Sequence, residues 1–241
     1  MIQQYQILSW DSEVFGFPVA KIVPERLSTE DLNRLLNDLR SQQIKLVYWV
    51  SDSQDAISQK AAQNANGFLA DHKMTYLCDL TQLKHTPEID SQIESCPIAD
   101  PDNDLLELGY LAGLYSRFKT DPRITDEQFK KVYQLWMINS THHRIAQEVL
   151  VIKKQQKNIA MVTLGEKNQR GDIGLLSVNP QFHGQQLGTK LVIAAQAWCL
   201  KQEYQWGQVV TQQSNLPACA LYEKCGYSIE KIENFYHFWL S

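Results

Sequence analysis

No hydrophobic run in the sequence is long enough to cross a bilayer. Apolar stretches such as "LVIAA" at residues 191–195 are short, whereas a membrane-spanning helix needs about 20 apolar residues in succession. The opening residues, "MIQQYQILSW", contain neither the basic segment nor the apolar segment of a secretory signal peptide. We therefore expect a cytoplasmic protein that does not have a membrane as its partner.

An excess of charge of one sign is also missing, because 23 Lys and Arg residues stand against 27 Asp and Glu residues, for a formal net charge of -4. Such a balance provides no general attraction to nucleic acid, so nucleic acid is not an expected partner. An anionic ligand must therefore be held by local geometry. The hydrophobic share of 44% over 241 residues is typical of a globular protein, with enough apolar side chains for one large or two small domains.

Cysteine is infrequent and shows no paired spacing. The five cysteines include no Cys-x-x-Cys pair and are odd in number, which favours reduced thiols over a disulfide framework. Metal-binding patterns are missing as well. The stretch "DPDND" at 100–104 starts like a calcium loop, but Leu105 and Leu111 stand where glycine and glutamate are needed. His142 and His143 are adjacent and so point apart, and we expect no metal site.

Strands and helices alternate in the first third of the sequence. A helix is predicted over 29–42, because Ser28 and Asp31 have the spacing of a capping box and leucines follow at helical spacing. A second helix is predicted over 55–66, ended by Gly67 in the C′ position. Strands are predicted at 4–10, 18–24, 45–51 and 74–80.

The polar, proline-broken stretch from Thr81 to Asp102 separates this region from the next. We predict a smaller α/β domain over residues 1–85, a linker over 86–100 and a second domain over 101–241. The second domain is predicted to contain helices at about 103–117 and 126–139, strands at 148–154, 159–166 and 172–178, a helix from Leu187 to Cys199, a strand at 207–213, a helix at 216–226 and strand material at 227–240. This order predicts an α/β fold of the α+β type, with a mixed, mostly antiparallel sheet flanked by helices.

Two helix ends in the sequence look alike. The segments "AAQNANGF" at 61–68 and "ALYEKCGY" at 220–227 both end in glycine and an aromatic residue, and a predicted strand follows each. Many junctions between a helix and a strand have this chemistry. The likeness therefore fits either an ordinary junction or an internal duplication.

The residues "NPQFHGQQLGTKL" at 179–191 follow a predicted strand and open a predicted helix. The first N–H groups of a helix lack internal partners and carry the positive end of the helix dipole, so this junction can bind an anion. Gly184 and Gly188 would let backbone and ligand approach closely. Because only two glycines are present, a plain surface loop is the alternative interpretation.

A second motif lies about thirty residues downstream, in "SNLPACALYEKCGY". Asn215 can cap the helix that begins there, Pro217 fits its first turn and Gly226 closes it. Together, the two stretches resemble the GNAT superfamily of acetyl-CoA-dependent N-acetyltransferases, and the downstream block is the more specific match.

The loop of that superfamily usually reads Arg/Gln-x-x-Gly-x-Gly/Ala. Here Gly188 fits, whereas His183 stands at the first position and Gln186 replaces the middle glycine. Backbone N–H donors need no particular side chain, so we expect Gln186 to fit with a negative φ. The resemblance implies acetyl-CoA as cosubstrate, with its pantetheine beside the strand as an added β-strand and a backbone N–H near Leu176 stabilising the developing oxyanion. The predicted cofactor-binding residues are Leu176, Val178, His183, Gly184, Gln185, Gln186, Gly188, Thr189 and Asn215.

Tyr222 matches the general acid of the family, since a phenol with a pKa of about 10 can protonate a departing thiolate. The alternative is an aromatic side chain that only packs. Two residues are candidates for the general base. Asp172 begins the strand "DIGLLSV", and His72 follows the first helix–strand junction. Each could instead be a solvated surface residue, with a chain of waters carrying the proton.

A narrower resemblance covers nearly the whole chain. The stretches "LSWDSEVFGFPVAKI", "SRF" and "DIGLLSV" are similar to those of bacterial dTDP-fucosamine acetyltransferases, two-domain enzymes that acetylate the 4-amino group of a nucleotide-linked deoxysugar. The resemblance implies a dTDP-linked amino sugar as the acceptor and partner. "SRFKTDP" is then predicted to be a non-helical loop over the acceptor, with Arg117 donating to a phosphate and Phe118 packing on the sugar or base. Alternatively, Arg117 is simply exposed and Phe118 anchors the loop.

Two other functions stay open. One is transfer to a different amine, such as a peptide N-terminus or a small metabolite, and the other is a binding module that performs no chemistry. The aromatic residues "FYHFWL" at 235–240 either pair as a strand between the subunits of a homodimer or belong to the core.

Overall fold

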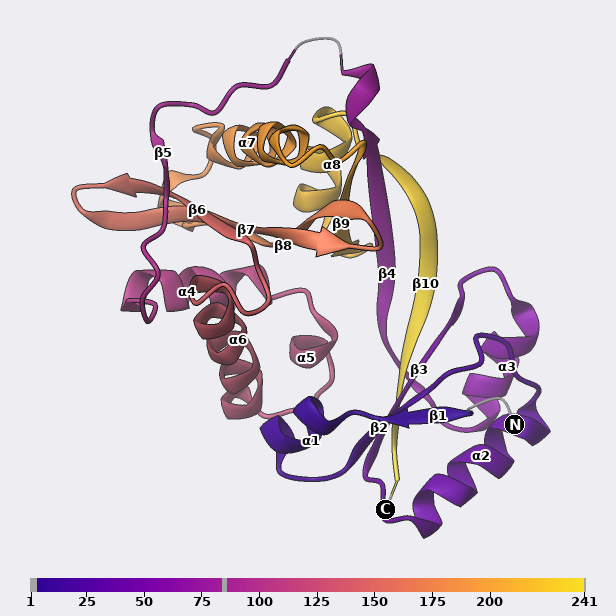
Figure 1. Ribbon diagram of the computed structural model, residues 1–241. Helices are drawn as coiled ribbons and strands as arrows, with labels where there is room; N and C mark the ends of the chain where they lie inside the picture. Colours follow the sequence, from indigo (N-terminus) through magenta and orange to yellow (C-terminus); the bar gives the residue numbers. More distant parts are fainter. Residues whose placement is uncertain (1–3, 84–85, 241) are drawn as a thin grey trace. The chain divides into compact units, whose positions relative to one another are not determined.

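The computed structural model describes residues 4–83 and 86–240. The chain forms two compact units (Figure 1). The first unit combines the residues up to 73 with 116–129 and the residues from 232 onward, and the second combines 74–115 with 130–231. Neither unit is continuous in sequence, because the chain leaves the first unit twice and returns to it with its last strand. Among the helices of the described part, none has the length and apolar character that spanning a membrane requires.

The sheet of the first unit has the strand order β1-β2-β3-β10-β4. β2 and β3 are parallel, while β1–β2 and β3–β10 are antiparallel. The elements are β1 (Tyr5–Ile7), α1 (Ser9–Phe15), β2 (Val19–Ile22), α2 (Thr29–Ser41), β3 (Leu46–Asp52), α3 (Ala56–Asn64), the first half of β4 (Phe68–Asp79), α5 (Arg117–Thr120) and the second half of β10 (Ser228–Trp239).

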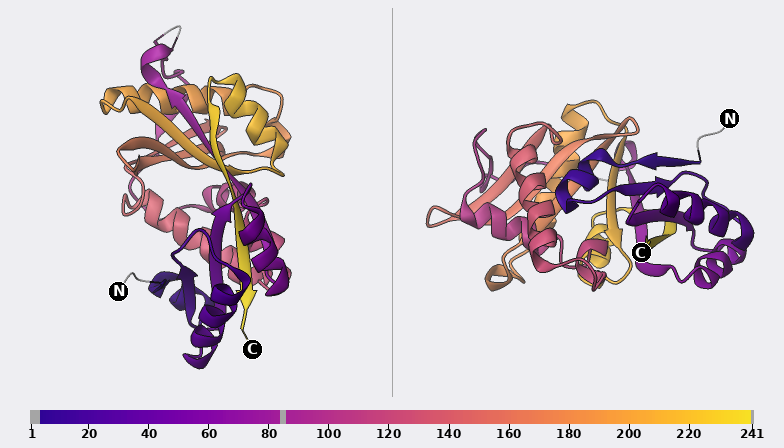
Figure 2. Two further views of the ribbon diagram at one scale, coloured as in Figure 1. Left: turned by 90° about the vertical axis from the view of Figure 1, so that its right-hand side faces the viewer. Right: turned by 90° about the horizontal axis from the view of Figure 1, so that it is seen from below.

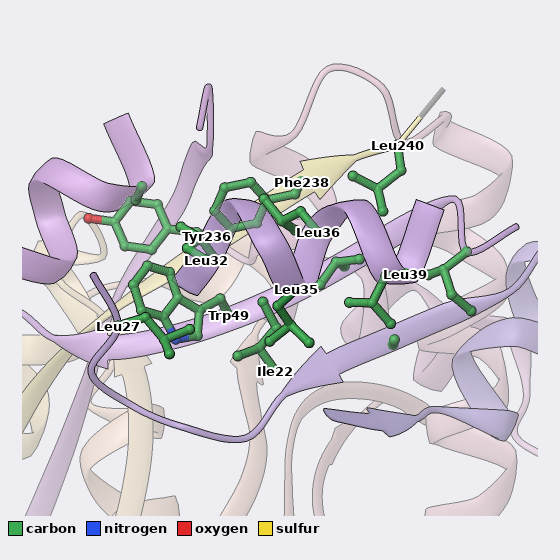
Figure 3. Packing of buried hydrophobic residues seen from close by; sticks show 14 of the residues in the cluster. Ile22, Leu27, Leu32, Leu35, Leu36, Leu39, Trp49, Tyr236, Phe238 and Leu240 are labelled. Carbon is green, nitrogen blue, oxygen red and sulfur yellow. The ribbon is translucent and has the colours of Figure 1, made fainter. Parts of the chain in front are cut away.

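Helix α2 begins and packs as its sequence predicts. The Ser28 hydroxyl accepts a hydrogen bond from the Asp31 backbone N–H and donates one to the Asp31 carboxylate. The leucines on one face of α2 point onto the sheet, where Trp49 and the aromatic side chains of β10 meet them (Figure 3). This cluster is the core of the first unit.

The strand predicted over 4–10 is too long, because β1 ends at Ile7 and helix α1 starts at Ser9. The Ser12 hydroxyl donates to the Leu8 carbonyl and accepts from the Val19 N–H. These two bonds fix the first turn of α1 against the start of β2.

The prediction that Gly67 occupies the C′ position of α3 is wrong. Asn66 takes the left-handed conformation there, with φ 56°, and the Gly67 N–H donates to the Ala62 carbonyl as in a Schellman motif. Gly67 is required for a different reason. A Cβ at this position would lie 2.7 Å from the Phe238 ring, so only glycine lets the ring pack there.

The second unit contains a larger sheet, with the order β10-β4-β9-β8-β7-β6-β5. Helix α7 packs on one face of β7 and β8 and helix α4 on the other (Figure 1 and the left view of Figure 2). The elements that begin in this unit are η1 (Leu80–Gln82), β5 (Ile93–Ser95), α4 (Asn103–Ala112), β6 (Glu148–Lys154), β7 (Lys157–Lys167), β8 (Arg170–Val178), η2 (Pro180–Phe182), α7 (Leu187–Lys201), β9 (Trp206–Gln212) and α8 (Leu216–Lys224), and α6 (Asp126–Thr141) enters it from the first unit. The predicted fold class, a mostly antiparallel sheet flanked by helices, is confirmed. Residues 86–100, expected to be a linker, contribute β5 to this sheet.

Strands β8 and β9 pair over a short distance and then separate. Their parallel ladder joins three residue pairs and ends at Ile173 and Val209. Directly beyond this point β8 has a register shift against β7, and the Leu175 N–H donates to the Thr163 hydroxyl at 2.8 Å. A bulge of this kind bends the strand. The end of β8 therefore turns an edge toward β9 that has no partner on β9 among the described residues.

The two similar helix ends belong to two strand–helix–strand segments whose elements have the same lengths. β3, α3 and β4 have seven, nine and twelve residues, and so do β9, α8 and β10. Each element of the second segment lies 160 residues after its counterpart. Equal lengths in the same order support the internal duplication over an ordinary junction.

The aromatic residues at 235–240 belong to the core of the first unit. β10 has β3 on one side and β4 on the other, and Tyr236, His237 and Phe238 are buried. Because both edges of β10 are already paired, pairing of this strand between the subunits of a dimer does not fit the structure.

Candidate active site

A cleft of about 620 Å³ lies in the second unit. Strand β8 contributes Leu176, Ser177 and Val178, and the turn after it contributes five residues from Pro180 to Gln186. The remaining lining comes from the first turn of α7, from α8 and its N-cap, and from the end of α4: Leu187, Gly188, Thr189, Asn215, Pro217, Ala218, Leu221, Lys224, Leu111, Ala112, Leu114 and Tyr115. The described residues of the lining include Lys224 and no carboxylate, so the cleft suits a ligand with an anionic group joined to an apolar one.

The turn between β8 and α7 depends on two left-handed residues. Gly184 has φ 78° and Gln186 has φ 59°. Gln186 is the N-cap of α7, and no side chain of residues 4–83 or 86–240 caps the helix there. The expectation that Gln186 keeps a negative φ is wrong. Its backbone takes the conformation for which the usual glycine is suited, at a cost of about 1 to 2 kcal/mol for a residue with a Cβ.

The other two loop residues also have defined roles. The His183 Nε2 lies 3.0 Å from the Val178 carbonyl, and since a carbonyl only accepts, Nε2 carries the proton. His183 therefore closes the turn against the end of β8. A Cβ at Gly188 would lie 3.1 Å from a methyl group of Leu221, so Gly188 lets α7 approach α8 closely.

Tyr222 lies on α8, the helix that lines the cleft with Ala218 and Leu221. Its side chain is 5% exposed, and its ring centroid lies 6.1 Å from that of Tyr76 and 6.0 Å from that of Tyr227. Burial raises the pKa of the Tyr222 phenol above its ordinary value. The phenol therefore keeps its proton at neutral pH, as a proton donor must.

Asp172 also belongs to the second unit, on β8 within the short ladder with β9. Its Oδ1 accepts a hydrogen bond of 2.8 Å from the Gln208 side-chain amide. Burial raises the pKa of the Asp172 carboxyl, against the lowering effects of that hydrogen bond and of Lys167. The other candidate base, His72, lies in the first unit, where its Nδ1 is 2.8 Å from the Asn234 side-chain oxygen. The carbonyl-type oxygen of Asn234 makes Nδ1 the protonated nitrogen of His72.

Residues 111–227 match the family model "Acetyltransferase (GNAT) family". This range contains the whole cleft, the left-handed turn and Tyr222. Residues 111–227, just under half of the chain, are therefore similar to the GNAT family.

The chain thus contains a segment that is similar to GNAT acetyltransferases. Among curated proteins it is 25% identical over 124 residues to the spore coat polysaccharide biosynthesis protein SpsD of Bacillus subtilis, a match that covers 52% of this chain and 43% of that protein. The chain accordingly spans less than half the length of this relative.

Solved structures show the same fold over nearly the whole chain. A GCN5-related N-acetyltransferase from Sphaerobacter thermophilus superposes with a TM-score of 0.63 at 12% identity, over 98% of this chain and 76% of that one. A tandem GNAT protein from the clavulanic acid biosynthesis pathway has a TM-score of 0.59 at 14% identity, over 94% and 76%. At these identities the likeness concerns the fold alone.

All the predicted cofactor-binding residues except Gln185 line this cleft. Asn215 does so as the N-cap of α8, with its side-chain oxygen accepting from the Ala218 N–H at 3.3 Å. The end of α4 and the residues after it also line the cleft, and the sequence did not predict them there. Leu114 is 46% exposed and Tyr115 39% exposed. Large apolar side chains that stay exposed to solvent can indicate a ligand-binding surface, but their exposure is known only from the folded structure.

The two predicted acceptor residues lie in the first unit. "SRFKTDP" is not wholly non-helical, because Arg117–Thr120 form the short helix α5 with Ser116 as N-cap. Phe118 is buried, and the Arg117 guanidinium carbon lies 3.8 Å from its ring centroid and 4.7 Å from that of Tyr48. This placement fits the alternative in which Phe118 anchors the segment. The Arg117 Nε is buried without a hydrogen-bond partner among the described residues.

Proposed function

We propose that this protein transfers an acetyl group from acetyl-CoA to the amine of a dTDP-linked 4-amino-6-deoxysugar. The observation that carries the proposal is the left-handed turn at Gly184 and Gln186. Within the described residues, this turn opens α7 without a side-chain cap and lies in the same cleft as the edge of β8 that is not paired with β9. Free helix N–H groups and an open strand edge together suit a ligand that has a diphosphate at one end and an amide-containing arm at the other.

The residues of the cleft fit acetyl-CoA. The backbone N–H groups of Gln185, Gln186, Gly188 and Thr189 would hold its diphosphate, and the edge at Leu176 and Val178 would pair with its pantetheine arm. Lys224 adds a positive charge to the lining. When bound, acetyl-CoA supplies the activated acetyl group as a thioester.

We assign two side chains of the second unit to proton transfer. Tyr222 holds its proton at neutral pH and would give it to the departing thiolate as general acid. Asp172 would receive the proton that the acceptor amine loses. Of the two candidate bases it is the one in the same unit as the cleft.

The choice of acceptor rests on resemblance and on one relative. "SWDSEVFGF" at 9–17 is similar to the corresponding stretch of dTDP-fucosamine acetyltransferases, and SpsD is by its name a polysaccharide biosynthesis protein. Arg117, whose Nε has no hydrogen-bond partner in the described part of the chain, stays a predicted contact of the acceptor's phosphates. Phe118 would support the guanidinium from its buried position.

Turnover with acetyl-CoA and dTDP-4-amino-4,6-dideoxygalactose, followed by thiol release, tests this function. We expect Tyr222→Phe to lower kcat by about 100-fold or more, because it removes the general acid, while the thermal unfolding temperature stays close to that of the wild type. Unchanged turnover in Tyr222→Phe would remove its assigned role.

The same assay separates the alternatives. If turnover is faster with a peptide N-terminus or a small amine than with any amino-sugar nucleotide, the proposed acceptor is wrong but the proposed acetyl transfer still holds. Calorimetric binding of CoA without acetyl transfer to any amine would favour a binding module. Absence of CoA binding would contradict both.

A further inference from the structure

Asp172 faces away from helix α7. A Cβ at the preceding Gly171 would collide with the Cys199 side chain on α7, and neighbouring residues of a strand point to opposite faces. Asp172 is partly exposed on its own face. It lies one residue before Ile173, where the ladder between β8 and β9 ends. The carboxylate therefore stands at the point where the two strands begin to separate.

A continuous chain of hydrogen bonds runs from Asp172 to the surface of the second unit. Gln208 lies directly opposite Asp172 on β9, is buried, and donates through Nε2 to Asp172 Oδ1 at 2.8 Å. Its Oε1 accepts from Arg170 Nη1 at 3.2 Å. Arg170 in turn binds both carboxylate oxygens of Glu230, at 2.9 Å each.

The chain fixes the orientation of the Gln208 amide. A guanidinium has only donors and an ionised carboxylate only acceptors. If the amide turned over, its NH₂ would face Arg170 and its oxygen would face Asp172, and both bonds would be lost. Arg170, held by Glu230, thus ensures that Gln208 donates to Asp172.

We propose that Gln208 is a positioning residue for Asp172 in acetyl transfer, holding the carboxylate ionised and aimed so that it accepts the proton of the acceptor's ammonium group. The proposal rests on the proposed function. In this step the N–H bond of the ammonium breaks, its electron pair stays on nitrogen for attack on the acetyl group, and an O–H bond forms at Asp172. Since Oδ1 accepts from Gln208, Oδ2 is the oxygen that receives the proton.

The competing explanation is that Gln208 only satisfies buried polar groups. Both explanations predict a loss of stability when Gln208 is removed, so stability cannot separate them. They differ in the ionisation of Asp172. Burial raises the pKa of this carboxyl and the bond from Gln208 opposes that rise, so removal of the donor must raise the pKa further.

The test compares Gln208→Leu with wild type in the pH profile of kcat/KM for the amino-sugar nucleotide. We expect kcat/KM of Gln208→Leu to fall about tenfold on the acid side of the profile and less than about twofold on its alkaline plateau, because deprotonation at higher pH restores the base. Arg170→Lys keeps the positive charge but loses the planar guanidinium that binds both Gln208 and Glu230. We expect kcat/KM of this variant to fall on the acid side as well, but by a smaller factor. The exposed Gln213, altered to Leu, is the matched control and should leave the profile unmoved.

A second readout needs no turnover. The ¹³C NMR titration of aspartate-labelled protein should show the Asp172 carboxyl titrating at higher pH in Gln208→Leu, or in Gln208→Met if the leucine variant does not fold. The proposal would be overturned if the titration of Asp172 were the same in the variant and the wild type. It would also be overturned if the titration shifted but kcat/KM on the acid side of the pH profile did not change. If the wild-type protein acetylates no amine, both the proposed function and the role of Gln208 are overturned. If it acetylates an amine but Gln208→Leu leaves the acid side of the kcat/KM profile unchanged, only the role of Gln208 is overturned.

Discussion

Gln186 adopts a backbone conformation that is usually adopted by glycine. Its φ of 59° belongs to the left-handed region, where a Cβ approaches the following carbonyl oxygen. The turn nevertheless forms, because the end of β8 and the first turn of α7 fix both of its ends. Gln185, one residue earlier, is not among the residues with positive φ.

This difference between neighbours gives a prediction at the residue scale. We expect Gln186→Gly to raise the free energy of unfolding by up to about 1 kcal/mol, and Gln186→Val to lower it by about 1 kcal/mol or more, since a β-branched side chain tolerates a positive φ poorly. Chemical denaturation measures both. Gln185→Val is the matched control and should change stability by less than about 0.5 kcal/mol; equal losses in the two valine variants would show that φ at 186 is not the cause.

At the scale of elements, helix α8 is defined at both ends by its own sequence. Asn215 caps its start, and Gly226, with φ 88°, follows its C-cap. The Tyr227 N–H then donates to the Tyr222 carbonyl, closing a Schellman motif. Because Tyr222 sits in the last turn, its place depends on both ends of the helix.

The N-cap of α8 can be tested separately from the chemistry. We expect Asn215→Ala to lower the free energy of unfolding by about 1 kcal/mol, because the Ala218 N–H loses its acceptor. Asn215→Asp keeps an acceptor at that position and should retain most of the stability, as measured by the midpoint of urea unfolding. A loss in Asn215→Asp as large as in the alanine variant would contradict a capping role.

The whole-molecule scale is where residues far apart in sequence determine stability. In the first unit the His237 Nδ1 is 2.7 Å from Asp121 Oδ2, which also accepts from the Trp239 indole at 2.8 Å. Both His237 and Asp121 are buried. These bonds tie the segment after α5 to β10, more than one hundred residues later in the chain.

The buried histidine predicts a pH dependence of stability. Burial lowers the pKa of His237 below its ordinary value of 6.5, against the raising effect of Asp121. Below about pH 6.5 the unfolded chain binds a proton at this position before the folded one does, so the free energy of unfolding should fall as the pH drops from about 6.5 toward the folded pKa. Above pH 7 this group should contribute no slope.

Urea unfolding of wild type and of His237→Gln between pH 5 and 8 measures the effect. The variant should be less stable at every pH, because Gln does not reproduce the ring packing, but its slope below about pH 6.5 should be smaller than that of the wild type. Asp121 does not interfere in this range, since hydrogen bonds from His237, Trp239 and Arg123 outweigh its burial and hold its pKa below 3.8. Parallel curves would exclude His237 as the source.

The sequence by itself determined most of the helices and strands and the location of the turn that opens α7. Ser28, Asn215 and Gly226 mark helix ends, and the period of the apolar residues distinguishes helix from strand, because these signals act over a few residues. The match of 179–191 and 215–227 to a GNAT pattern likewise depends on local spacing. Most of the cleft lining was therefore accessible from the sequence.

Only the tertiary structure decided the rest. The left-handed φ of Gln186, the helical turn at Arg117, the interior place of β10 and the contact of Gln208 with Asp172 depend on residues far away in sequence. So does the burial that raises the pKa of Tyr222. Packing between distant segments can override the local conformational preference of a residue when it buries enough apolar surface. A short stretch of sequence does not show which distant residues will pack against it.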